Sequence, residues 1–140
     1  MKTMICIGAL LLTTCLIGCG HATPTSETYS VEAKQTQLTT GRKNEVEISV
    51  QYHRSKQPAA KLSYRVQFSG PPGLAVSPTS WDVQQNLTTN DAGFYYNGIV
   101  TIEVANDAEP GEREVTITIT PDHGTASTKT MKFQVVREDN

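Results

Sequence analysis

The stretch Glu45-Val46-Glu47-Ile48-Ser49-Val50-Gln51-Tyr52 places an apolar residue at every second position. Neighbouring side chains of a β-strand point to opposite faces, whereas a helix repeats its apolar side every three or four residues. Valine and isoleucine also favour strands, because their branched side chains pack well on a pleated surface. This stretch therefore predicts a β-strand with one buried and one solvated face.

Six further segments share this alternation, and turn residues separate them. They are residues 29–33, 62–68, 74–77 together with 81–83, 100–104, 115–119 and 131–135. Pro78 interrupts the third of these segments, which we expect to form one broken strand, and we expect a polar loop over 84–90. Seven short strands between residues 28 and 138 predict an all-β, antiparallel sandwich of two sheets with a core about 10 Å thick.

Three segments resemble the immunoglobulin-like accessory domains of bacterial surface and periplasmic proteins. They are Gly73-Leu74-Ala75-Val76-Ser77-Pro78, then Ala108-Glu109-Pro110-Gly111 with the strand that follows it, and Lys132-Phe133-Gln134-Val135-Val136. The resemblance covers nearly all of residues 28–138 and implies a seven-stranded antiparallel immunoglobulin-like β-sandwich. It implies a fold and no particular function.

The beginning of the chain has the pattern of an export signal. A single Lys2 precedes an uncharged apolar run over residues 4–17, which is shorter than the roughly 20 residues needed for a helix that crosses a membrane. The run ends at Leu16-Ile17-Gly18-Cys19, which resembles the lipobox of bacterial lipoproteins. That resemblance implies cleavage between Gly18 and Cys19 and attachment of lipid, including palmitate, to the sulfur of Cys19.

Together with the small, polar composition of residues 20–27 and the strand pattern that follows, this resemblance predicts three parts of the chain and a location. They are a lipoprotein signal peptide at 1–18, a lipidated flexible tether at 19–27 and the sandwich at 28–138. Lipid on Cys19 would anchor the protein to a membrane of the bacterial cell envelope. Gly20 fits sorting to the outer membrane if the host has one.

Cysteine content and charge exclude several classes of function. Cys6 and Cys15 would leave with the signal peptide and Cys19 would be alkylated, so the mature chain has no thiol for a disulfide, a nucleophile or a metal site. The mature chain keeps 11 basic and 14 acidic side chains, a net side-chain charge of −3. We expect no binding of nucleic acid, which would require a basic patch.

The candidate catalytic groups all have a simpler structural interpretation. The closely spaced carboxylates are Glu45 with Glu47 and Glu112 with Glu114. Both pairs alternate with apolar residues, so we expect them on solvated sheet faces. His53 and His123 lack the short spacing of metal ligands, and the Asn and Asp residues of the turns lack the alternation of a calcium loop. We therefore expect no enzyme activity, no metal and no cofactor.

Two aromatic features could contribute to binding. Trp81 is in step with Val83, which favours a core position over a sugar-stacking platform. The run Phe94-Tyr95-Tyr96 cannot point inward at all three positions of a strand, so at least one ring should face solvent or a partner. Phe94, Tyr95 and Tyr96 therefore form the candidate contact surface. Chance exposure of one ring beside two packed ones is an equally good interpretation.

Two classes of function remain open. The first is a non-catalytic, lipid-anchored interaction module that holds another envelope protein or a glycan through its loops or sheet faces. The second is an envelope inhibitor or exclusion factor that blocks an incoming enzyme, phage or conjugating partner. A loop shaped to enter an active site would favour the second class, and a broad flat sheet face would favour the first.

The topology of the predicted sandwich also suggests how it is oriented. The loops at 54–59, 86–97 and 122–128 should share the end at which the first strand begins, and the short tether would turn that end to the membrane. Arg54, Lys56 and the aromatic run would suit a headgroup interface there. The far end should carry residues 70–73, 106–111 and the acidic tail.

Overall fold

The predicted alternation produces nine strands in the computed structural model, which describes residues 27–55 and 58–138. They are β1 (Thr28–Ala33), β2 (Gln37–Thr39), β3 (Lys43–His53), β4 (Ala60–Ser69), β5 (Leu74–Ser77), β6 (Ser80–Leu87), β7 (Gly93–Val104), β8 (Gly111–Pro121) and β9 (Ser127–Val136). Gly18 and Cys19, with the rest of the expected signal and nearly all of the tether, lie outside the described residues. In the part that is described, no helix has the length and apolar character needed to cross a membrane.

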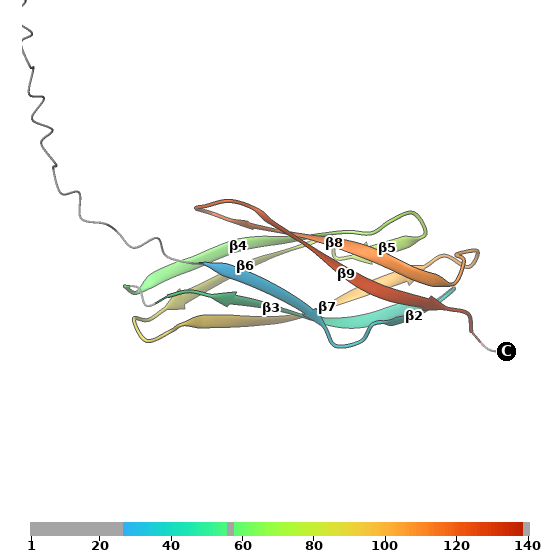
Figure 1. Cartoon of the computed structure of the whole chain (residues 1–140), viewed down its shortest axis with the longest axis horizontal. Coiled ribbons are helices and arrows are strands. Elements are labelled where there is room, and N and C mark those ends of the chain that lie inside the picture. Colours follow the sequence, from blue (N-terminus) through green and yellow to red (C-terminus); the bar gives the residue numbers. More distant parts are fainter. Residues whose placement is uncertain (1–26, 56–57, 139–140) are drawn as a thin grey trace, which may run out of the picture.

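The strands form two layered sheets whose strands run along the long axis of the domain (Figure 1). The four-stranded sheet has the order β1-β3-β7-β5, and all its neighbours are antiparallel. The five-stranded sheet has the order β2-β9-β8-β4-β6. Its neighbours are antiparallel except for β2 and β9, which run parallel.

The prediction of an all-β sandwich is confirmed, but the expected number of seven strands was wrong. One additional strand is β2, which joins the second sheet after the chain leaves β1 and crosses over residues 34–36. Because the chain does not reverse direction there, β2 lies parallel to β9. Only Leu38 of its three residues is buried, so this strand is too short to produce an alternation in the sequence.

The second additional strand comes from the segment around Pro78. β5 pairs with β7 in one sheet and β6 pairs with β4 in the other, so the expected broken strand is two strands in different sheets. The polar loop expected over 84–90 was also wrong, because β6 continues to Leu87, which is buried. The half-buried Gln85 stands in step with the apolar residues Val83 and Leu87 and interrupts their pattern.

The inward side chains of both sheets fill one core. Val46, Ile48 and Val50 on β3 are fully buried, and Tyr52 is almost so, which confirms the alternation read from the sequence. These residues belong to one cluster with apolar side chains of the five-stranded sheet. Among the described residues, every buried side chain of the cluster lies between residues 29 and 135, so a segment that starts at Glu27 retains this cluster.

Seven of the nine strands occupy the positions of an immunoglobulin-like sandwich. In that fold one sheet holds strands A, B, E and D, and the other holds C, F and G. Here β1, β3, β7 and β5 match the first sheet, and β4, β8 and β9 match the second, in the same chain order. The remaining strands, β2 and β6, form the two edges of the five-stranded sheet.

Three loops meet at the end of the sandwich where β1 begins, as the topology predicted. Arg54, in the loop between β3 and β4, donates hydrogen bonds to the carbonyls of Thr88 and Asp91 in the loop between β6 and β7. His123, in the loop between β8 and β9, and Arg54 both line a surface hollow at this end. We call this end of the domain the β1 end.

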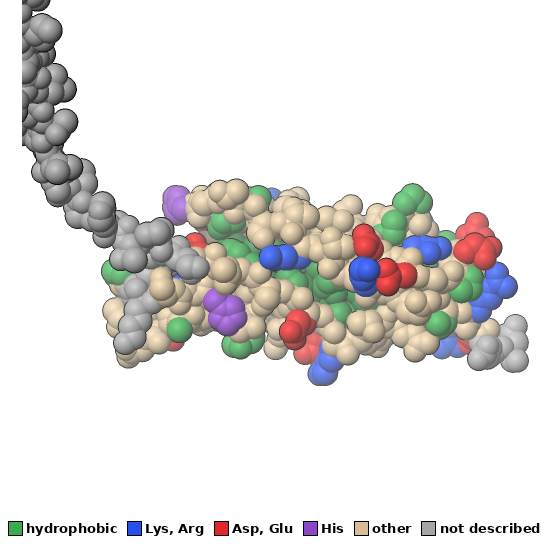
Figure 2. Space-filling model, in the orientation of Figure 1, with side chains coloured by type: hydrophobic (Ala, Val, Ile, Leu, Met, Phe, Trp, Pro, Cys, Tyr) green, Lys and Arg blue, Asp and Glu red, His purple; other side chains and the backbone are tan. Residues whose placement is uncertain are grey.

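The other end of the sandwich, here called the far end, is held by contacts between the remaining loops and the last residues described. The amide of Ala105 donates to the carbonyl of Gly73 at 2.9 Å. Arg137 lies 3.5 Å from the carboxylate of Glu109. Figure 2 shows basic and acidic side chains gathered at this end, on the right of the view.

Candidate functional site

The outer face of the four-stranded sheet displays two large hydrophobic side chains. Tyr95 is 62% exposed and Ile99 is 61% exposed, both on β7. They are four residues apart and therefore lie on the same face of the strand, about 13 Å from each other at the rise of a β-strand. Among the described residues they are the exposed large hydrophobic side chains. We call this surface the Tyr95–Ile99 face.

The neighbours of these two residues on β3 are polar. Gln51 lies opposite Tyr95 and its amide donates a hydrogen bond to the Tyr95 hydroxyl. Ser49 lies opposite Asn97, between the two hydrophobic residues. Uncharged groups of this kind lose less solvation free energy than ions when a partner covers them.

Charged side chains lie next to Ile99. Glu47 is its cross-strand neighbour and pairs with Lys34 at 3.0 Å. Glu45 precedes it on the same face of β3 and is exposed. As the sequence predicted, both glutamates of this pair therefore lie on the outer face of the sheet, apart from the core.

The rest of the predicted contact surface points inward. Phe94 and Tyr96 are half-buried and pack against the core, while Tyr95 between them points outward. All three belong to β7 and not to a loop. Of the three aromatic residues named from the sequence, the structure displays Tyr95, and it adds Ile99, which the sequence analysis missed. The signal was present, since Ile99 is out of step with Val100 and Ile102.

Trp81 lies at the lateral opening between the two sheets. Its ring packs edge-on against Phe68, with centroids 4.7 Å apart, and against Tyr96 at 5.5 Å. The prediction of an inward position is correct, but the side chain is only partly buried because β6 is an edge strand. Its packing against two aromatic rings favours a structural role over sugar stacking.

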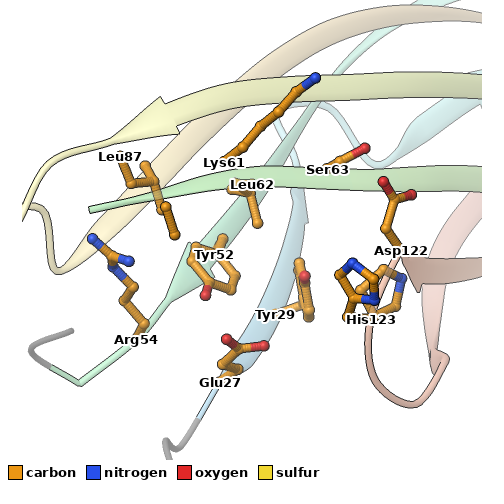
Figure 3. Close-up of a pocket in the computed structure, with 12 residues that line it drawn as sticks. Glu27, Tyr29, Tyr52, Arg54, Lys61, Leu62, Ser63, Leu87, Asp122 and His123 are labelled. Carbon is orange, nitrogen blue, oxygen red and sulfur yellow. The ribbon is translucent and has the colours of Figure 1, made fainter. Parts of the chain in front are cut away.

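A hollow of about 280 Å³ opens at the β1 end (Figure 3). Its apolar walls include Tyr29, Tyr52 and Leu62. Its charged walls carry both signs and come from Glu27, Arg54, Lys61 and Asp122, and His123 also lines it. In the described parts of the chain, no three His, Cys, Asp or Glu side chains lie close enough together to hold a metal ion.

Arg54 has a structural position that the sequence did not predict. Its side chain is buried, and its guanidinium donates to the carbonyls of Thr88 at 2.6 Å, Asp91 at 2.9 Å and Pro58 at 3.2 Å. The residue therefore ties together two loops at the β1 end. The expectation that it faces lipid headgroups was wrong, because its charge is used internally. Lys56 lies outside the described residues.

Three tyrosines line the core beneath this end. The rings of Tyr52 and Tyr64 lie 5.2 and 5.3 Å from the ring of Tyr29. Burial raises the pKa of Tyr29 to about 12, with a smaller contribution from the charge of Glu27. Burial also raises the pKa of Tyr52, to which a hydrogen bond with Glu27 adds, and the pKa of Tyr64. These phenols are neutral at ordinary pH.

Comparisons with known proteins concern the fold. No family model and no curated protein matches the sequence. The periplasmic chaperone SfaE matches with a TM-score of 0.51 and 16% identity, over 79% of this chain and 58% of that chain. The native conformation of E. coli α2-macroglobulin matches with a TM-score of 0.55 and 11% identity, over 79% of this chain and 7% of that chain. The chain therefore spans about half of the first structure and a small part of the second, and both likenesses agree with the immunoglobulin-like β-sandwich.

Proposed function

We propose that this chain is a non-catalytic, lipid-anchored protein of the bacterial cell envelope that binds another envelope protein or a glycan through the Tyr95–Ile99 face. The observation that carries the proposal is the exposure of Tyr95 and Ile99 on one side of an otherwise polar sheet. Tyrosine and aliphatic side chains that stand out from a polar surface are typical anchors of protein interfaces.

The form of the domain favours an interaction module over an inhibitor or exclusion factor. An inhibitor that enters an active site would need a protruding loop. Among the connections that the structure describes throughout, the longest is residues 105–110, with six residues. The four-stranded sheet instead offers a broad face, which is the feature expected of the first class.

The proposed anchor rests on the lipobox-like segment Leu16-Ile17-Gly18-Cys19. β1 begins at Thr28, so eight residues would separate the lipidated cysteine from the first strand. A short tether of this kind keeps the domain near the membrane surface. Two or more acyl chains on one cysteine would make the attachment durable, whereas a single chain gives only marginal binding.

Site-specific photo-crosslinking in intact cells tests the binding face. A photoreactive phenylalanine analogue at position 95 should form one dominant adduct, and the same group at Thr130 on the outer face of the other sheet should not. Ile99→Asp in the position-95 variant should remove the adduct, because a charge in the interface must be desolvated. Equal adducts from both faces, or an adduct insensitive to Ile99→Asp, would rule out this face as the binding site.

A further inference from the structure

The free edge of the five-stranded sheet is β6, whose described neighbour is β4 on one side. The amide of Phe68 donates to the carbonyl of Thr79 at 2.8 Å, one residue before β6 begins. Hydrogen bonding alternates along an antiparallel pair, so Trp81, Val83, Gln85 and Leu87 direct their backbone groups to β4. The other four residues of β6 therefore direct their backbone N–H and C=O groups away from β4, toward the open side of the sheet. These four residues are Ser80, Asp82, Gln84 and Asn86.

These outward backbone groups lack strong partners. Within residues 27–55 and 58–138, no strand or loop pairs with this edge, and no group accepts a hydrogen bond from the four N–H groups. The one contact is a long hydrogen bond of 3.4 Å from the Gln85 side chain to the Asn86 carbonyl. The edge is thus a ready template for another strand.

The remaining sheet edges are protected in ways that β6 is not. β2 has three residues, and β5 has four and is followed by Pro78. β1 has six residues, and Glu32 and Lys34 lie at the point where it leaves its sheet. β6 has eight residues, with no proline and no basic residue. Its single charge, Asp82, is neutralised by Arg65 of β4 through bonds of 2.7 and 3.2 Å.

We propose that β6 pairs antiparallel with β6 of a second copy of this chain, which joins two five-stranded sheets into one sheet of ten strands. Such a pairing has two requirements. The free backbone groups of one β6 must face those of the other β6, and the core-facing side chains of both copies must lie on the same face of the joined sheet. A two-fold axis at Val83 meets both conditions. It places Val83 opposite Val83 of the second copy, Asp82 opposite Gln84, and Ser80 opposite Asn86.

The side chains fit this symmetric pairing. No like charges lie opposite one another, and the amide of Gln84 can donate to the carboxylate of Asp82 across the interface. On the inward face Trp81 lies opposite Gln85, and both are partly buried in one copy. The second copy would cover the remaining exposed part of the Trp81 ring at the lateral opening. The same surface on both partners is what a two-fold interface requires.

An edge of eight residues is smaller than a typical stable interface, which buries about 800 Å² on each partner. The dimer should therefore be weak in solution and should form where the protein is concentrated.

In this pairing the β1 ends of the two copies point in opposite directions. With the two-fold axis along the membrane normal, both N-termini reach one membrane and the domains lie flat.

The self-association can be measured on a domain that starts at Glu27, because this segment retains the core cluster of the described residues. Sedimentation equilibrium should show a monomer–dimer equilibrium. Gln84→Pro removes an outward N–H and leaves the β4 pairing intact, so it should weaken the dimer at least tenfold at unchanged circular dichroism. Gln84→Glu should do the same, because it places a carboxylate opposite Asp82 of the second copy. Gln67→Glu, on the same face of the interior strand β4, should not.

The register has its own test, since this domain contains no cysteine. Val83→Cys should form an intermolecular disulfide on mild oxidation, because directly opposite residues of a non-hydrogen-bonded pair lie within disulfide range. Leu87→Cys, four residues along the same face, should not. A domain that stays monomeric up to millimolar concentration would overturn the proposal. So would an association that both Gln84 variants leave unchanged, or crosslinking that is equal at positions 83 and 87.

Discussion

Gly98 on β7 lies directly against the indole ring of Trp81 on β6, and a methyl group placed on Gly98 would come within 2.6 Å of two ring carbons. Because the ring is already packed against Phe68 and Tyr96, it cannot move away freely. The absence of a side chain at position 98 is therefore what allows the two sheets to approach at this side of the sandwich.

Gly98→Ala is expected to lower the free energy of unfolding by about 1–3 kcal/mol, the usual cost of overpacking a core. In a Trp81→Ala background the same change should cost much less, because the space is then free. Urea denaturation of the four proteins of this cycle measures the coupling. Asn97→Ala, at an outward position next to it, is the control that should stay within about 0.5 kcal/mol of the parent. Additive effects in the cycle would mean that the ring and the glycine do not interact.

Arg54→Ala should destabilise the domain by about 3 kcal/mol, because three backbone carbonyls lose a charged donor in a buried place. Arg54→Lys should recover only part of this, since an ammonium group cannot reach three acceptors with the geometry of a guanidinium. Thermal unfolding followed by circular dichroism measures the loss. The matched control is Arg65→Ala, which removes an exposed ion pair with Asp82 and should change the melting temperature far less. Similar losses for both arginines would contradict the role given to Arg54.

The buried tyrosines predict alkaline unfolding. Burial raises the pKa of Tyr29 from about 10 to about 12, so the folded state holds its proton more tightly than the unfolded chain does. The resulting stabilisation is complete below pH 10 and is lost as the pH rises from 10 through 12. Melting temperatures should therefore fall steeply across this window. Tyr29→Phe should make the fall shallower, and a flat profile from pH 9 to pH 12 in the parent protein would contradict the burial of these phenols.

Tyr64→Phe is expected to raise the stability at neutral pH by up to about 1 kcal/mol. Its hydroxyl is buried and finds no hydrogen-bond partner in the described part of the chain, so the native state bears the cost of desolvating it. Tyr52→Phe should give no such gain, because the Tyr52 hydroxyl is not one of the buried hydroxyls that lack a partner. Urea midpoints compared across the two variants measure the difference. A loss of stability in Tyr64→Phe would indicate that the hydroxyl has a partner, such as a buried water.

Cys19→Ser should leave an uncleaved precursor, because the thiol is the expected site of lipid attachment. Intact-mass measurement of the parent protein from membranes should show a chain that starts at Cys19 and carries acyl groups. Gly18, the residue before the expected cleavage point, should be absent from that chain. An unmodified N-terminus at another residue would remove the basis for the proposed anchor.

Much of the fold could be predicted from the sequence because its strands have one buried and one solvated face. β3 shows this alternation from Glu45 to Tyr52, and β8 shows it from Val115 to Ile119. The prediction failed for β2, where three residues are too few to carry a period, and for β6, where a glutamine occupies an inward position. In both cases pairing with a neighbour distant in sequence determines the strand, and that information is not local.

The candidate site was predicted in part for a similar reason. The outward position of Tyr95 follows from the geometry of any strand that contains three consecutive aromatic residues. The burial of Arg54 does not follow from local sequence, because two of its three acceptors come from residues more than thirty positions away. A charged residue in a loop suggests exposure, and only the assembled loops show otherwise.

The crossing of the chain from one sheet to the other between β1 and β2 has a mechanical consequence. β1 begins at one end of the sandwich and β9 finishes at the opposite end (Figure 1). A force that pulls the two termini apart would act along the strands. It would load the hydrogen bonds of β1 to β3 and of β2 to β9 in shear, so that many must break together. The domain should therefore resist unfolding when tension is applied between its two ends.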